Sequence, residues 1–117
     1  MATKSTLSGP AADYLKFLRD AQKARSLASA PGIDANEEAL LNALALAWVG
    51  GKPLAVRAAM GLSQLGSPST LHRRISRLKA LGLIEDASSP DSLRIKLLVP
   101  SNRALSYFGR LGKAVAG

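Results

Sequence analysis

The residues best suited to chemistry in this chain are the cations of one short stretch. No acidic residue lies between Glu38 and Glu85, and six cations fall in that interval. Four of the six crowd into residues 67–84, namely Arg73, Arg74, Arg77 and Lys79. Guanidinium and ammonium groups bind phosphate oxygens, and arginine also pairs with the edge of guanine. Because a surface of one sign costs electrostatic self-repulsion, the pattern indicates a polyanionic partner.

Composition narrows the class of partner and excludes several kinds of site. The net charge of +8 on 117 residues favours nucleic acid or an anionic membrane surface. No apolar run approaches the ~18 residues that a membrane span needs, so we expect the protein not to associate with a membrane. The absence of cysteine excludes disulfides and thiolate zinc sites. Aromatic residues make up 4% of the chain, too few for the base-stacking surfaces typical of RNA binding.

No catalytic or metal-binding constellation emerges from the sequence. His72 is the single histidine, and no residues of suitable type accompany it as metal ligands or as a catalytic triad. No paired carboxylates occupy an apolar setting, and the glycines fall at expected helix ends rather than in a phosphate-binding loop. We therefore predict that the chain is not an enzyme and needs no metal or cofactor.

The four clustered cations belong to an amphipathic helix that is expected to follow Ser67, here called the recognition helix. At ~100° per residue its apolar positions form one stripe. The stripe contains Leu71, Ile75, Leu78 and Gly82. The opposite side contains Ser69, Arg73, Ser76, Arg77 and Ala80. The edges of the stripe are flanked by Thr70 and Arg74 on one side and by His72 and Lys79 on the other.

This arrangement predicts a helix that enters the major groove of double-stranded DNA. Short side chains in the first turn allow close approach, and arginines further along reach bases or phosphates. The predicted base-reading residues are Ser69, Thr70, Arg73 and Arg77. The predicted phosphate-binding residues are Ser67, Arg57, Arg74, Arg94 and Lys96.

A solvated cationic face is the alternative interpretation of the same helix. It is disfavoured because no acid is interspersed for i,i+4 pairing, and because a short helix and a turn come immediately before. Two interpretations of His72 stay open: a contact with an edge of the DNA, or ordinary exposure to solvent.

The elements before the recognition helix follow from apolar periodicity and from helix-end signals. A first helix is expected from Pro10 to about residue 30, where Pro31 and Gly32 end it. A second is expected from the capping box of Asp34 and Glu37 to the glycines after residue 49, with Trp48 in the core. A short third helix over residues 54–60 completes the group.

After the recognition helix the apolar period changes from helical spacing to two. Leu93, Ile95, Leu97 and Val99 alternate with polar residues, which predicts a β-hairpin with a polar tip at residues 88–92. Ser101 is then the expected N-cap of a final helix.

Residues in this order carry a family resemblance. The stretch from Leu54 to Glu85 resembles the winged helix-turn-helix of MarR-type bacterial regulators, with the spacing Arg74-x-x-x-Leu78-x-x-x-Gly82-Leu83-Ile84 at the junction from helix to wing. The stretch from Val99 to Leu105 is similar to the passage from the wing into the next helix. The resemblance covers about residues 34–112.

The resemblance implies a homodimer that binds a pseudo-palindromic operator, with the first and last helices in the dimer interface. The residues assigned to dimerisation are Tyr14, Leu15, Phe17, Leu18, Leu27, Phe108 and Leu111. Two of them, Leu15 and Leu27, lie off the apolar stripe of the first helix and favour a second buried face independently.

Two departures from the family pattern bear on function. The family commonly carries an arginine near the wing tip that enters the minor groove, whereas Ser92 stands there beside Asp91. Wing contacts are therefore expected to be weak or to phosphate alone. The chain is also short after the wing, which leaves a small-molecule effector an open question.

The expected fold is mainly α with a small β-hairpin wing, a winged helix-turn-helix with extra terminal helices for dimerisation. The domain plan has a flexible N-terminus at 1–9, a dimerisation helix at 10–32, the DNA-binding domain at 33–100 and a C-terminal helix at 101–117. The expected function is sequence-specific DNA binding by a dimeric transcriptional regulator, most simply a repressor. Because the first residues lack a signal-peptide layout, a cytoplasmic, nucleoid-associated bacterial protein is expected. The alternatives are a protein-binding adaptor or anti-repressor, and a non-specific plasmid- or phage-maintenance DNA binder.

Overall fold

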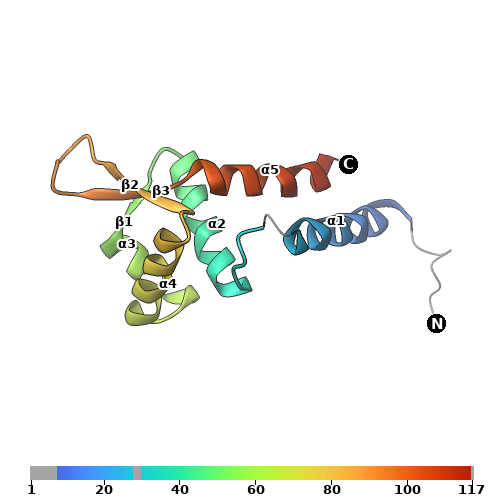
Figure 1. The fold of residues 1–117 in the computed structure, drawn as a ribbon, viewed down its shortest axis with the longest axis horizontal. Coiled ribbons are helices and arrows are strands. Elements are labelled where there is room, and N and C mark those ends of the chain that lie inside the picture. The colour runs from blue at the N-terminus through green and yellow to red at the C-terminus, as the bar shows by residue number, and fades with distance from the viewer. Residues whose placement is uncertain (1–7, 28–29, 117) are drawn as a thin grey trace. The chain divides into compact units, whose positions relative to one another are not determined.

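The computed structural model describes residues 8–27 and 30–116. The predicted mainly helical chain with a small antiparallel sheet is confirmed (Figure 1). The elements are α1 (Gly9–Ser26), α2 (Ala35–Val49), β1 (Leu54–Ala55), α3 (Val56–Met60), the 3-10 turn η2 (Ser63–Leu65), α4 (Pro68–Ala80), β2 (Ile84–Ser88), β3 (Lys96–Pro100) and α5 (Asn102–Ala116). They divide into two compact units: Ile33–Leu105, and α1 with the residues from Ser106 onward.

The sheet lies in the first of these units and has the strand order β1-β3-β2, with every pair antiparallel. The register pairs Ile84 with Pro100 and Ser88 with Lys96, so β2 and β3 form the wing, whose loop is residues 89–95 (Figure 1). On the other side of β3, Leu54 pairs with Leu98.

Two sequence predictions about these strands are wrong. The third helix was expected from Leu54, but Leu54 and Ala55 form β1, because pairing with β3 outweighs their helical propensity. Leu93 and Ile95 were expected in a strand but lie in the wing loop, where they are exposed. The loop closes through a hydrogen bond from the Ser89 amide to the Ile95 carbonyl, and β3 begins at the next residue.

The hydrophobic core of the Ile33–Leu105 unit joins α2, α4 and the sheet. The predicted stripe of α4 is buried at Leu71, Ile75 and Leu78, whereas the glycine at its end is exposed. The other buried apolar residues of this unit include Leu40, Leu41 and Leu44 of α2 and Leu83, Ile84 and Leu98 in or beside the sheet. The prediction that Trp48 is core is wrong, because its side chain is 37% exposed.

Helix ends agree closely with their sequence signals. Asp34 and Glu37 form the predicted capping box of α2. The Ser101 hydroxyl accepts from the Ala104 amide at 3.1 Å and caps α5 as predicted. Gly82, with φ 72°, ends α4 in a Schellman motif in which the Leu83 amide bonds the Leu78 carbonyl at 2.9 Å. The sharp stop fixes where the helix gives way to the wing.

The second unit contains α1, which begins with a proline in its first turn, as expected. The helix ends at Ser26, earlier than predicted, and Leu27 is extended with ψ 147°. Residues 1–7 of the expected flexible N-terminus and residues 28–29 of the expected first helix lie outside the described part of the chain.

Candidate nucleic-acid interface

The first turn of α4 presents a cluster of hydroxyl groups. Ser67 is the N-cap, and its Oγ accepts from the Thr70 amide at 3.3 Å and donates to Thr70 Oγ1 at 3.0 Å. Ser69 is exposed, with its Oγ 3.4 Å from that of Ser67. The predicted contact residues Ser67, Ser69 and Thr70 are therefore brought together at the positive end of the helix dipole, where an anion is favoured.

Arg74 ties α4 to the turn that precedes it. Its Nη1 donates to the carbonyl of Leu65 in η2 at 2.8 Å, so this predicted phosphate ligand already has a partner inside the helix-turn-helix. This hydrogen bond lies close to Gly66. A Cβ added at Gly66 would lie 3.3 Å from Arg74 Nη1 and 3.4 Å from Thr70 Cγ2. Gly66 also has φ 147° and ψ 177°, a conformation that only glycine adopts readily.

We expect Gly66→Ala to destabilise the domain by about 1–3 kcal/mol, because the alanine must adopt a strained backbone and displace the arginine. Chemical unfolding followed by circular dichroism measures the change. Gly112→Ala in α5 is the control, since a Cβ there meets nothing within 4 Å. Equal stability of Gly66→Ala and the parent protein would contradict the role assigned to this glycine.

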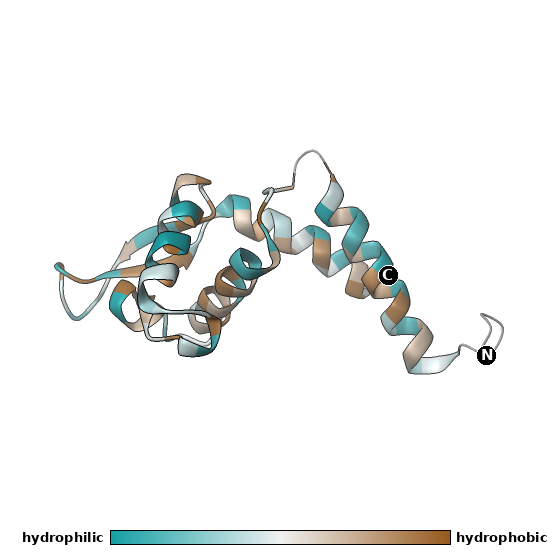
Figure 2. Cartoon of the chain, turned by 90° about the horizontal axis from the view of Figure 1, so that it is seen from below, coloured by the Kyte–Doolittle hydropathy of each residue, from teal (hydrophilic) through white to brown (hydrophobic). Residues whose placement is uncertain are grey.

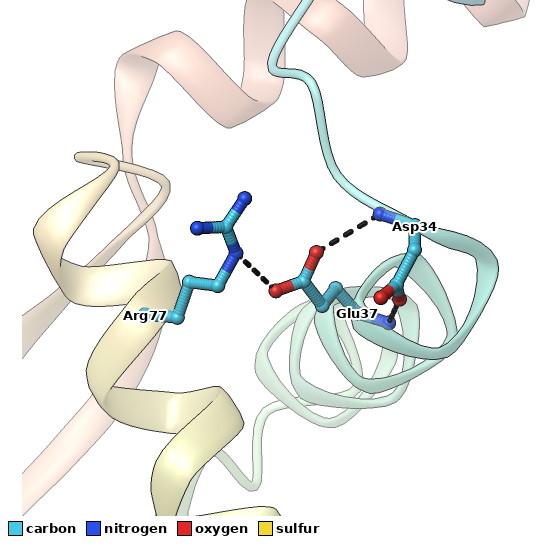
Figure 3. A network of polar contacts seen from close by, with 3 residues as sticks. All are labelled: Asp34, Glu37 and Arg77. Atoms are coloured by element: carbon cyan, nitrogen blue, oxygen red, sulfur yellow. Dashed lines mark hydrogen bonds and ion pairs between the residues drawn. The ribbon is translucent and has the colours of Figure 1, made fainter.

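Arg77 is tied to α2. Its Nε pairs with Oε2 of Glu37, while Oε1 of the same carboxylate accepts from the Asp34 amide at 2.9 Å (Figure 3). The Asp34 carboxylate in turn accepts from the Glu37 amide at 2.7 Å. The capping box of α2 is thus linked through Glu37 to Arg77 of the recognition helix, α4. The sequence identified Glu37 as half of that box but gave no signal for its second partner.

The C-terminal end of α4 is held by three further contacts. Lys79 pairs with Asp86 of β2 at 2.8 Å. Ser101 donates to the Gly82 carbonyl at 2.6 Å, and Arg103 Nη1 donates to the Leu81 carbonyl. Side chains near the start of α5 therefore satisfy carbonyls that the end of α4 leaves open.

Arg73 stands apart from the other cations of α4. It is exposed, and no hydrogen bond or ion pair to it is found among residues 8–27 and 30–116. As expected from the sequence, no acidic residue lies on α4 itself for i,i+4 pairing. Glu37 and Asp86 nevertheless reach Arg77 and Lys79 from other elements.

Arg57 and His72 share a shallow hollow between α3 and α4. The hollow has a volume of about 640 Å³ and is lined also by Val56, Met60 and Pro68. Both polar side chains are exposed, so the structure brings a predicted phosphate ligand and the histidine left open by the sequence to one surface.

The wing carries the remaining predicted phosphate ligands. Arg94 lies in the loop and Lys96 is the first residue of β3, and both are exposed. Ser92 accepts from the Arg94 amide at 3.2 Å, and the Ser89 hydroxyl accepts from the Asp91 amide at 3.2 Å. The two serines therefore shape the loop.

The residues assigned to dimerisation fall in the second unit. In α1, Tyr14, Leu15 and Leu18 are exposed and Phe17 is half-buried, while Leu27 just beyond the helix is 51% exposed. Hydrophobic and hydrophilic residues are interspersed along this helix (Figure 2). In α5, Phe108 and Leu111 are half-buried. Several large apolar side chains on and just after α1 are therefore exposed among the described residues.

The described part of the chain lacks two kinds of feature. No helix within residues 8–27 and 30–116 is both long and apolar enough to cross a membrane. The same residues contain no group of three or more His, Cys, Asp or Glu side chains that could hold a metal ion.

Solved structures with a similar fold give the architecture a family context. The sequence matches no protein-family model, and no curated protein matches it. RV1404 from Mycobacterium tuberculosis is similar with a TM-score of 0.62 and 19% identity over 90% of this chain and 67% of that one. MarR is similar with a TM-score of 0.53 and 15% identity over 86% and 64%. The PcaV transcriptional regulator from Streptomyces coelicolor, in complex with its natural ligand, has a TM-score of 0.52 and 24% identity over 99% and 77%. The chain therefore has a MarR-like winged-helix fold.

Proposed function

We propose that the chain is a sequence-specific DNA-binding protein that regulates transcription as a dimer, most simply as a repressor that occludes a promoter. The observation that carries the proposal is the state of α4. This helix is fixed at both ends and along its inner side by its own domain, and it presents Arg73, which has no partner among the described residues, beside a hydroxyl-rich first turn. Such a rigid, cationic helix suits the major groove.

The proposed contacts divide by chemistry. Ser69, Thr70, Arg73 and Arg77 would read bases from α4. Phosphates on either side of α4 would be bound by Arg57 of α3, by Arg94 and Lys96 of the wing, and by Ser67 and Arg74. The wing loop contains Asp91 and has Ser92 at its tip. These residues support a wing that follows the DNA backbone rather than one that enters the minor groove.

A salt titration of duplex binding tests the proposal against a protein-binding adaptor. If Arg57, Arg74, Arg94 and Lys96 of both protomers neutralise phosphates, the logarithm of the association constant should fall with log salt at a slope of about −7. Fluorescence anisotropy with a labelled duplex measures it. A flat response, or no binding at low salt, would favour the adaptor. A steep response without preference for any sequence would favour a maintenance protein.

Dimerisation through α1 yields a separate prediction. We expect Leu15→Glu to weaken self-association by at least about tenfold, because each protomer would bring an unpaired carboxylate into the interface. DNA affinity should fall with it, since only a dimer contacts two half-sites. Sedimentation velocity measures the assembly. Leu93→Glu is the matched control, because Leu93 is 82% exposed and lies on the wing. If Leu15→Glu dimerised as strongly as the parent protein, α1 would not be part of the dimer interface.

A further inference from the structure

Glu37 is the one charged side chain found buried in the described part of the chain, at 5% exposure. A buried carboxylate is stable only when its oxygens have partners. The capping box uses just one of them, since Oε1 accepts from the Asp34 amide at 2.9 Å. The second oxygen is directed at Arg77 of α4. This contact goes beyond what a helix cap requires.

The pairing engages Arg77 through one edge of its guanidinium group. Nε faces Glu37, and the two terminal nitrogens point away from the carboxylate (Figure 3). The Arg77 side chain is 53% exposed, so it is not enclosed by its own domain. A guanidinium held in this way still has two parallel N–H groups for a bidentate contact.

The charges of the pair cancel, which sets Arg77 apart from Arg73. An ion pair adds little to the long-range attraction for a polyanion, whereas a fixed guanidinium loses little freedom on binding. Arg77 is also one turn from Arg73 on the same side of α4. The Arg77–Glu37 pair therefore fixes the direction of a contact between Arg77 and the polyanion, and it adds little electrostatic attraction.

We propose that Glu37 is a positioning residue for DNA recognition, which sets sequence specificity by aiming the terminal nitrogens of Arg77 at the DNA. The proposal rests on the proposed function of the chain. It assigns a buried acidic residue of α2, away from the recognition helix in sequence, to the reading of DNA. Removal of the carboxylate charge should lower the preference for the correct site while non-specific binding is kept or strengthened.

Glu37→Gln tests the proposal with little change of shape. The glutamine oxygen can still accept from the Asp34 amide, but its NH₂ group meets the Arg77 donor, so the pairing is lost. Asp34→Ala is the matched control, because it removes the other half of the capping box without touching Arg77. Anisotropy titrations would use a duplex selected by the parent protein and a scrambled duplex of equal length, over a series of KCl concentrations.

We expect Glu37→Gln to reduce the ratio of specific to scrambled affinity by about tenfold, the discrimination of one bidentate contact. Affinity for the scrambled duplex should stay or rise, and Asp34→Ala should keep the parent ratio. In an Arg77→Ala background, Glu37→Gln should change the ratio no further, because it acts through that arginine. A purely structural role predicts instead that both affinities fall in parallel.

The outcomes separate this proposal from the function on which it rests. If the parent protein prefers the selected duplex and Glu37→Gln keeps the full ratio, or loses both affinities together, the positioning role is overturned and the proposed function stands. If the parent protein does not distinguish the two duplexes, both are overturned.

Discussion

Arg73→Ala should lower affinity for the selected DNA site by about 1–3 kcal/mol per contact and relax the sequence requirement at one base position of each half-site. The expectation follows from the position of this side chain. Arg73 is exposed on α4, and no partner for it is found within the described residues. Its removal should therefore leave thermal stability unchanged, so that any loss of binding reports a lost contact with DNA.

Two matched variants show what kind of contact is lost. Arg73→Lys keeps the charge but removes the planar pair of donors, so it should behave like alanine if the contact is to a guanine edge. Arg19→Ala removes the same charge from α1 and should leave binding nearly unchanged. Competition titrations with single-base variants of the site provide the measurement. Undiminished affinity and an unaltered footprint for Arg73→Ala would refute the base-reading assignment.

Leu78→Ala should lower the free energy of unfolding by about 2–5 kcal/mol, because it leaves a cavity between the recognition helix and its support. Leu78 is fully buried, and its carbonyl also receives the Schellman bond that ends α4. Natural domains are stable by only about 5–15 kcal/mol, so the loss is a large fraction of the total. DNA binding should weaken at physiological temperature although no DNA-facing group has changed.

The same substitution at an exposed leucine separates cavity formation from loss of side-chain surface. Leu93→Ala, in the wing loop, should change stability by no more than about 0.5 kcal/mol. Urea unfolding of the three proteins, followed by circular dichroism, gives the comparison. If Leu78→Ala were as stable as Leu93→Ala, the packing described for α4 would be wrong.

The elements of the fold were predictable where local chemistry specifies them. The spacing of Asp34 and Glu37 marks a helix start, and Ser101 marks another. The stripe of Leu71, Ile75 and Leu78 assigns the inner side of α4 by periodicity alone. These features depend on neighbours within one or two turns, which is the range over which a sequence pattern carries information.

The failures concern contacts between residues far apart in the chain. β1 exists because two residues pair with β3, and nothing local distinguishes them from the start of α3. The position of Trp48 was misjudged because α2 is apolar on every side, so a helical wheel does not show which side packs inward. Pairing of Arg77 with Glu37 and of Lys79 with Asp86 likewise joins separate elements.

Those ion pairs change the interpretation of the cationic stretch. From the sequence, Arg73 and Arg77 lie opposite the apolar stripe of α4, whereas Arg74 and Lys79 lie at its edges. In the structure, Arg74, Arg77 and Lys79 each hold the helix to another part of the domain. Much of the charge that indicates DNA binding thus serves to orient the helix. Arg73, for which the described part of the chain contains no partner, is the strongest candidate for direct recognition.

Selection of bound sites from random duplex DNA, performed in parallel with the parent protein and Arg73→Ala, shows whether α4 reads DNA through Arg73. We expect the parent protein to enrich a two-fold symmetric motif, with half-sites about one helical turn apart. Arg73→Ala should enrich the same motif with one position per half-site degenerate. Absence of any enriched motif, or identical motifs from the two proteins, would contradict the claim that α4 reads DNA through Arg73.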